Sequence, residues 1–129
     1  MPRRYGLPRA RAFDTSTQDD AIAAAIVTAR QFAGVNAQTG TAYTFAASDA
    51  GKIVTRTNAG ASTVTIPTNA AVPGIPIGSS ILVVNLGAGA ITPNGAGTTI
   101  HTASITTIAQ GAAAMFTKLG TDTWLIGRA

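Results

Sequence analysis

Short alternating segments separated by turn residues fill residues 39–70, and they constrain the fold more than any other feature of the chain. Tyr43 and Phe45 alternate with alanine and threonine, and Val64 and Ile66 alternate with threonine. A two-residue period is typical of strands with one face in a core and the other in water. Turn-forming residues at 48–51 and 58–61 separate the segments. The stretch therefore predicts three short strands in a β-meander.

The chain after residue 70 continues this pattern. Residues 80–86, SILVVNL, are the most apolar run and predict a central strand covered on both faces. Asn85 is its polar exception, and burial would require partners, for which neighbouring turn amides are the best candidates. Further short strands are expected at 90–92, 98–101, 105–108, 111–119 and 123–127, with turns at 93–97 and 120–122. The predicted fold is mainly β, an antiparallel β-sandwich or small barrel of the jelly-roll type.

Two different segments precede this β-domain, which we assign to residues 35–129. Residues 1–15 predict an extended arm, because Pro2 and Pro8 lack amide donors and disfavour helix in the residues before them. Residues 16–34 predict one α-helix. Ser16 or Thr17 caps its first amides, acidic residues follow, and Gly34 ends it.

Positive charge is concentrated in the arm. Of the nine basic residues, four lie within the first eleven positions, and the other five balance the five acidic residues. We interpret the arm as a tether in which arginines pair with carboxylates or phosphates and apolar side chains fill pockets on a neighbour. A solubilising tail is the alternative, and nucleic-acid binding is less favoured because such arms usually carry more charge. The candidate attachment residues are Arg3, Arg4, Tyr5, Leu7, Arg9, Arg11 and Phe13.

The composition indicates a surface that is partly covered. Only 11% of the residues are charged, glutamate is absent, and the mean hydropathy is +0.27. A monomer normally carries more charge, so we expect contacts with copies of the chain or with a partner. No run of about 18 apolar residues predicts a membrane span. Asp14, Asp19 and Asp20 interrupt the start, which argues against a signal peptide.

The residues needed for catalysis are scarce. The chain has no cysteine and a single histidine, His101, and it contains no G-x-S-x-G motif, zinc spacing or calcium loop. The aspartates are better explained as caps and turn formers. His101 is expected to face solvent or a subunit interface, and Trp124 is expected in the core. We predict a protein that is not an enzyme and holds no cofactor or metal.

Several motifs occur in an order that suggests a family. They are TAYTF at 41–45, DAGK at 49–52, TVTIP at 63–67, ILVV at 81–84 and TDTWLIG at 121–127. From about residue 39 to residue 128, the chain resembles a module of tailed-bacteriophage virion proteins. The resemblance implies a structural protein of the capsid surface or the tail fibres, usually a trimer.

The module makes up nearly the whole chain, which favours a small capsid decoration (cement) protein over a long fibre. On this interpretation the protein is a homotrimer on the capsid surface of the virion, and its arm and helix bind the major capsid protein. The alternative is a tail-fibre or spike protein that binds a host glycan, with candidate contacts at Tyr43, Trp124 and the turns of Asn58 and Asn94. A connector or tail-completion protein is a third possibility.

Overall fold

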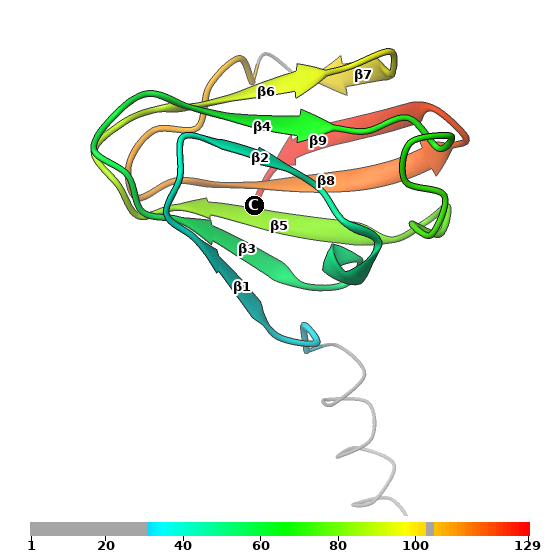
Figure 1. Cartoon of the computed structure of the whole chain (residues 1–129), viewed down its shortest axis with the longest axis horizontal. Coiled ribbons are helices and arrows are strands. Elements are labelled where there is room, and N and C mark those ends of the chain that lie inside the picture. The colour runs from blue at the N-terminus through cyan, green and yellow to red at the C-terminus, as the bar shows by residue number, and fades with distance from the viewer. Residues whose placement is uncertain (1–30, 103–104) are drawn as a thin grey trace, which may run out of the picture. The chain divides into compact units, whose positions relative to one another are not determined.

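In residues 31–102 and 105–129, which the computed structural model describes, the chain forms two β-sheets (Figure 1). Sheet A has six strands, in the spatial order β1 (Val35–Gln38), β3 (Ile53–Arg56), β5 (Ser80–Asn85), β8 (Ala113–Gly120), β9 (Thr123–Arg128) and β7 (Thr99–Thr102). Sheet B has three strands, β2 (Ala42–Thr44), β4 (Ser62–Ile66) and β6 (Ile91–Gly95). A short 3-10 helix, η2 (Ala47–Asp49), follows β2. Residues 33–129 form one compact unit.

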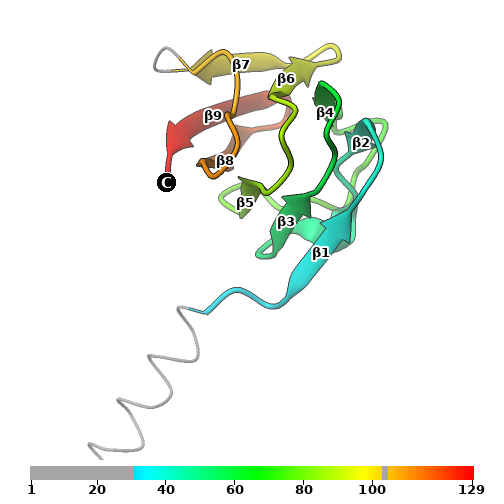
Figure 2. The ribbon, with the colours of Figure 1, turned by 90° about the vertical axis from the view of Figure 1, so that its left-hand side faces the viewer.

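The first six strands follow a coiled path. Successive strands alternate between the two sheets, so that β1, β3 and β5 lie in sheet A while β2, β4 and β6 lie in sheet B. Every neighbouring pair within these two sets is parallel. The strands therefore form three stacked coils, β1–β2, β3–β4 and β5–β6, and Figure 2 looks roughly along their strands. Each coil extends the core formed by the coil before it.

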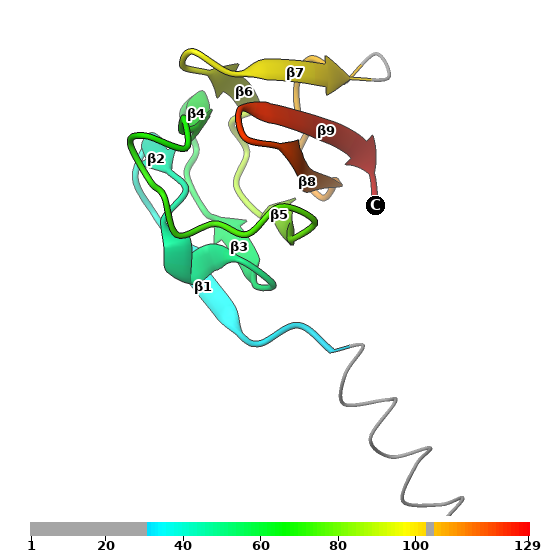
Figure 3. The ribbon, with the colours of Figure 1, turned by 90° about the vertical axis from the view of Figure 1, so that its right-hand side faces the viewer.

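The last three strands close the domain differently. Strand β8 pairs antiparallel with β5, and β9 pairs antiparallel with β8. Strand β7 then pairs parallel with β9 at the edge of sheet A (Figure 3). This hairpin covers the edge of β5 that a fourth coil would otherwise occupy, and so ends the parallel stack.

The predicted antiparallel jelly-roll-like sandwich or barrel is wrong, and so is the β-meander. Sheet B is entirely parallel, and sheet A is parallel except where β8 pairs with β5 and β9. The prediction failed because a two-residue period reports only which face is buried and is the same for both strand directions. The turn at Asn58 does not form a hairpin but carries the chain from sheet A to sheet B.

Single elements were predicted better than their pairing. Strand β5 is central, as expected, although its second face, which carries Leu82 and Val84, is only half-buried. The final β8–β9 hairpin with its turn at 121–122 is confirmed. Residues 93–95 were expected to turn but belong to β6, where Pro93 is tolerated because β6 is an edge strand. Residues 105–108 make only one bridge, between Ile108 and Ile91.

The predicted arm, residues 1–15, lies outside the described residues, as does the predicted helix up to residue 30. The remaining part of that helix, residues 31–34, is described and is not helical. Residue 33 instead donates its backbone amide to the carbonyl of Gly51, 2.9 Å away. The end of the predicted helix at Gly34 is therefore wrong.

One hydrophobic core lies between the sheets, and aromatic residues form its centre. Phe45, Phe116 and Trp124 are all at most 1% exposed. The rings of Phe45 and Phe116 meet edge to face with centroids 5.2 Å apart, and Phe45 stacks on Trp124 at 6.0 Å. Burial of Trp124 confirms its predicted place in the core. Isoleucines and valines from both sheets surround the aromatic group.

The turns at one end of the coils stack directly on each other. Asn58 accepts a hydrogen bond from the Gly60 amide at 2.7 Å, and its Nδ2 donates to the Thr39 carbonyl at 2.7 Å. The Gly89 amide donates to the Asn58 carbonyl at 3.1 Å. A Cβ added at Gly89 would lie 1.9 Å from the Gly60 oxygen. Only glycine therefore allows the two backbones to approach this closely.

Asn85 joins the same end of the coils to the segment that returns toward β8. It is fully buried, and its Nδ2 donates to the carbonyls of Gly89 at 2.8 Å and Ile108 at 2.9 Å. Its Oδ1 accepts from the Gly87 amide at 3.0 Å. The prediction that a buried Asn85 would bind turn backbone is confirmed.

Candidate functional site

The attachment residues predicted from the charge distribution cannot be placed. Arg3, Arg4, Tyr5, Leu7, Arg9, Arg11 and Phe13 all lie outside the described residues. The site that the described residues do form is a polar cluster on the first coil and the adjoining strand β3. It comprises Asn36 and Gln38 of β1, Tyr43 of β2, Asp49 of η2 and Arg56 of β3.

Asp49 is the centre of this cluster. It is 1% exposed, and it accepts hydrogen bonds from the Tyr43 hydroxyl, the Asn36 Nδ2 at 2.9 Å and the Ala46 amide at 2.8 Å. The last bond confirms the expectation that Asp49 acts as a cap. Asn36 also donates to the Tyr43 hydroxyl at 2.7 Å, and Gln38 donates to the Asn36 Oδ1 at 2.8 Å. The inner positions of β1 are therefore occupied by amides instead of aliphatic groups.

This arrangement suits the terminal coil of a stack. Asn36 is in register with Val54 of β3 and, through it, with Val83 of β5, whereas Gln38 is in register with the polar Arg56 and Asn85. Because β1 has a neighbour on one side only among the described residues, its inner side chains are half-exposed. Polar side chains there tolerate water and hold the first coil to the η2 helix through hydrogen bonds.

Tyr43 has an altered acidity. Burial, together with the hydrogen bond and the negative charge of Asp49, raises the pKa of Tyr43 from 10.0 to about 12. The neutral phenol is the form that donates to the carboxylate, so this cluster favours the protonated side chain.

We expect the stability contributed by Tyr43 to depend on alkaline pH. Because the folded-state pKa lies above the unfolded value, the contribution is complete below pH 10 and is lost as the pH rises toward 12. Melting temperatures of the wild type and Tyr43→Phe should therefore converge across this interval, whereas below it the wild type should be more stable. A constant difference up to pH 12 would contradict the proposed coupling between Tyr43 and Asp49.

Arg56 is the cation of the cluster and was not recognised in the sequence as a buried residue. It is 2% exposed, and its two terminal nitrogens donate to the carbonyls of Gly40 at 3.1 Å and Thr63 at 3.3 Å. Burial lowers its pKa below the usual value for arginine. The signal was available, because Arg56 has the same strand parity as the buried Val54.

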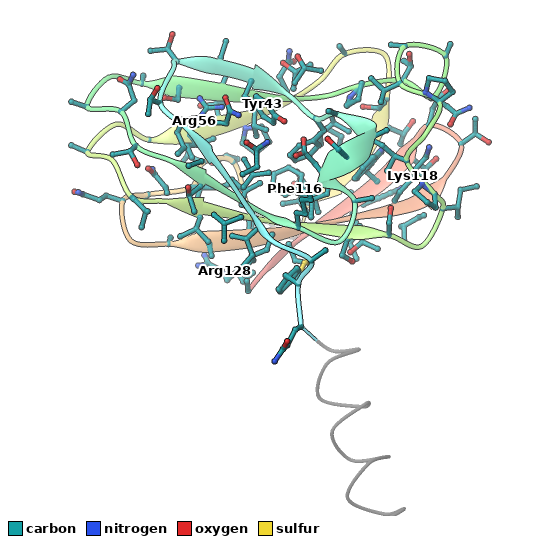
Figure 4. All side chains as sticks on the ribbon, turned by 60° about the horizontal axis from the view of Figure 1, so that its bottom comes forward. Tyr43, Arg56, Phe116, Lys118 and Arg128 are labelled. Carbon is teal, nitrogen blue, oxygen red and sulfur yellow. The ribbon has the colours of Figure 1, made fainter. Side chains whose placement is uncertain are left out.

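A second buried cation, Lys118, lies at the opposite end of the core from Arg56 (Figure 4). Its Nζ donates to the Asn69 Oδ1 at 2.9 Å and to the Ile75 carbonyl at 2.8 Å. The Asn69 amide in turn donates to Asp122 at 2.7 Å. Lys118 thus fastens the loop between β4 and β5 to the β8–β9 hairpin. Its inward parity with Phe116 in β8 is the signal that sequence reasoning missed.

The other candidate sites offer few side chains for binding or catalysis. A cavity of about 200 Å³ lies beside residues 105–108 and Arg128, below the roughly 300–1,000 Å³ of typical ligand pockets. His101 is exposed on β7, which confirms the expectation that it is surface-accessible. In the described residues, no three side chains of the metal-binding types form a group that would hold an ion. No helix within the described ranges is long and apolar enough to cross a membrane.

The residues suggested for glycan binding are not brought together as a binding face. Trp124 is fully buried in the core, and Tyr43 is engaged by Asp49. Asn58 uses both ends of its amide to hold the turn stack. Asn94 is exposed in the edge strand β6 instead of in a turn. The stacking aromatic that a glycan site needs is therefore not supplied by either predicted residue.

The surface of the described domain carries very little charge. Arg56, Lys118 and Asp49 are buried, so that Lys52, Asp122 and Arg128 are the charged side chains that reach the surface in residues 31–102 and 105–129. Large apolar side chains are exposed instead, with Val35 at 63%, Ile77 at 62% and Leu86 at 53%.

Comparison with known proteins adds no assignment. The chain matches no model of a known protein family and no curated protein sequence.

Proposed function

We propose that this chain is a non-enzymatic structural protein of a tailed bacteriophage, a homotrimeric capsid decoration protein that binds the major capsid protein. The observation that carries the proposal is the nearly uncharged surface of the described domain. Its buried charged side chains, Asp49, Arg56 and Lys118, form hydrogen bonds within the domain. Such a surface is suited to burial against other protein subunits.

The distribution of charge supports different roles for the arm and the β-domain. Four arginines lie in the first eleven residues, whereas the described domain exposes only three charged side chains. In the proposed mechanism the arm attaches to the shell through charge-assisted hydrogen bonds, and the β-domain adds buried area across junctions between capsid subunits. The resemblance of the motif order to phage virion modules is a second support, and it comes from the sequence alone.

The test is co-sedimentation of the full chain with undecorated, tailless phage heads. We expect saturable binding at many copies per head. Replacing Arg3, Arg4, Arg9 and Arg11 together by alanine should weaken binding about tenfold or more, since each charge-assisted contact contributes up to about 1 kcal/mol. Arg128→Ala is the matched control, because it removes an exposed arginine of the β-domain.

Two outcomes would change the proposal. Unchanged binding by the fourfold variant would show that the arm is not the attachment site. No binding by the wild-type chain would remove capsid decoration and leave the tail-fibre or spike alternative, for which host-cell and glycan binding would be measured next.

A further inference from the structure

We propose that the outer face of sheet A, the face turned away from sheet B, is the surface through which copies of this chain associate. Its apolar members are Val35, Ile53, Leu82, Val84, Met115 and Leu125. The inference deepens the proposed self-association, and it does not depend on a capsid as the binding partner.

Strand register aligns four of these side chains in a continuous row. Val35 is paired with Ile53, Ile53 with Leu82, and Leu82 with Met115, which joins four neighbouring strands. The alternate residues of the same strands, Val54 and Val83 among them, point into the core and are 1% exposed. The row therefore belongs to the opposite face, where Val35 and Leu125 are 63% and 40% exposed.

The charges of sheet A are confined to other positions. Arg56 and Lys118 have inward parity and are buried, while Arg128 shares the parity of the inward-facing Trp124 and Ile126. The outward positions of the sheet A strands hold no aspartate, glutamate, lysine or arginine within the described residues. The outward positions also hold Thr55, Thr117 and His101. Because a surface in water normally carries many charged side chains, the lack of aspartate, glutamate, lysine and arginine on this face indicates that it is covered.

A second copy of the chain is the occupant that this face suits best. Uncharged faces of neighbouring copies can meet without like-charge repulsion, in a trimer as well as in a dimer. Six strands spaced about 4.8 Å apart, with about five residues of about 3.3 Å each, give about 450 Å² of flat area per copy. Two such faces, with the added relief of their side chains, approach the roughly 1,000 Å² of a specific interface.

Sedimentation velocity of the full chain tests the inference, with one charge introduced at the centre of the face and one outside it. Met115→Glu places a carboxylate on β8, near the middle of the six-stranded sheet, and we expect it to weaken self-association at least tenfold, because the charge would be desolvated without a partner. Ile77→Glu is the control: Ile77 is 62% exposed and lies in the loop before β5, so association should be unchanged. The fluorescence of the single tryptophan verifies that both variants are folded.

The absence of cysteine permits a second measurement that introduces no charge. Leu125→Cys and Ile77→Cys each create one thiol, and maleimide labelling reports its accessibility. At high protein concentration, Leu125→Cys should react at least tenfold more slowly than Ile77→Cys, and dilution should remove most of this difference.

The results that would overturn the inference are distinct. The first is a wild-type chain that is monomeric at all concentrations. The second is an oligomer that Met115→Glu leaves intact. The third is a Leu125→Cys thiol that stays protected from maleimide even in the monomer. The last would mean that the chain's own N-terminal residues cover the face. A monomer that still binds phage heads would contradict this inference alone, whereas an oligomer that does not bind heads would contradict only capsid decoration.

Discussion

Gly89→Ala is expected to lower the free energy of unfolding by about 3 kcal/mol or more, because the added methyl group would collide with the backbone of the preceding coil. Its Cβ would lie 1.9 Å from the carbonyl oxygen and 2.2 Å from the carbonyl carbon of Gly60. Backbone atoms cannot rotate away as a side chain would, so the two turns must separate. The hydrogen bond from the Gly89 amide to Asn58 would then be lengthened or lost.

Denaturant unfolding followed by Trp124 fluorescence measures this effect. Gly40→Ala is the matched control in the turn of the first coil, where the nearest atom to an added Cβ is the Ala42 oxygen at 3.9 Å. The control should change stability by less than about 1 kcal/mol. If Gly89→Ala were as stable as the control, the close stacking of the turns described here would be incorrect.

Phe116→Ala is expected to cost about 3–5 kcal/mol, the range observed when large aromatic residues are removed from cores. Phe116 is fully buried, and its ring meets Phe45 edge to face at 5.2 Å. Its removal opens a cavity at the centre of the core (Figure 4), where strands of both sheets meet. Thermal and denaturant unfolding should both detect the loss.

A truncation at an exposed site separates cavity formation from general loss of side-chain volume. Ile77 is 62% exposed, so Ile77→Ala should alter stability by about 0.5 kcal/mol or less. Equal effects of Phe116→Ala and Ile77→Ala would contradict the assignment of Phe116 to the centre of the core.

The sequence predicts the elements of this fold far better than their arrangement. The strand at β5, the final hairpin, the burial of Trp124 and the bonding of Asn85 follow from periodicity, turn residues and the need to pair buried polar groups. The parallel coils do not follow, because Asn58 and the glycine near it suit a hairpin and a turn between sheets equally well. That distinction is made by long-range pairing, such as that of Ile53 with Leu82, which no local pattern encodes.

The polar cluster was predicted only in part. Asp49 was recognised as a cap, yet the burial of Arg56, and of Lys118 at the other end of the core, was not predicted, because long cations are seldom buried. Their inward parity was visible in the sequence, but parity alone does not reveal the carbonyls of Gly40, Thr63 and Ile75 that compensate for burial. Those carbonyls come from distant turns and loops, whose position depends on the whole fold.

The β8–β9 hairpin that closes the parallel coils also determines when this domain can fold during its synthesis. The three coils leave the ribosome before residues 113–128, and until then the core lacks Phe116, Trp124 and Ile126 while the edge of β5 has no partner. The domain therefore completes its folding only after its last strand has been made. Nascent chains should remain sensitive to proteases until that point, and their tryptophan emission should report the moment of closure.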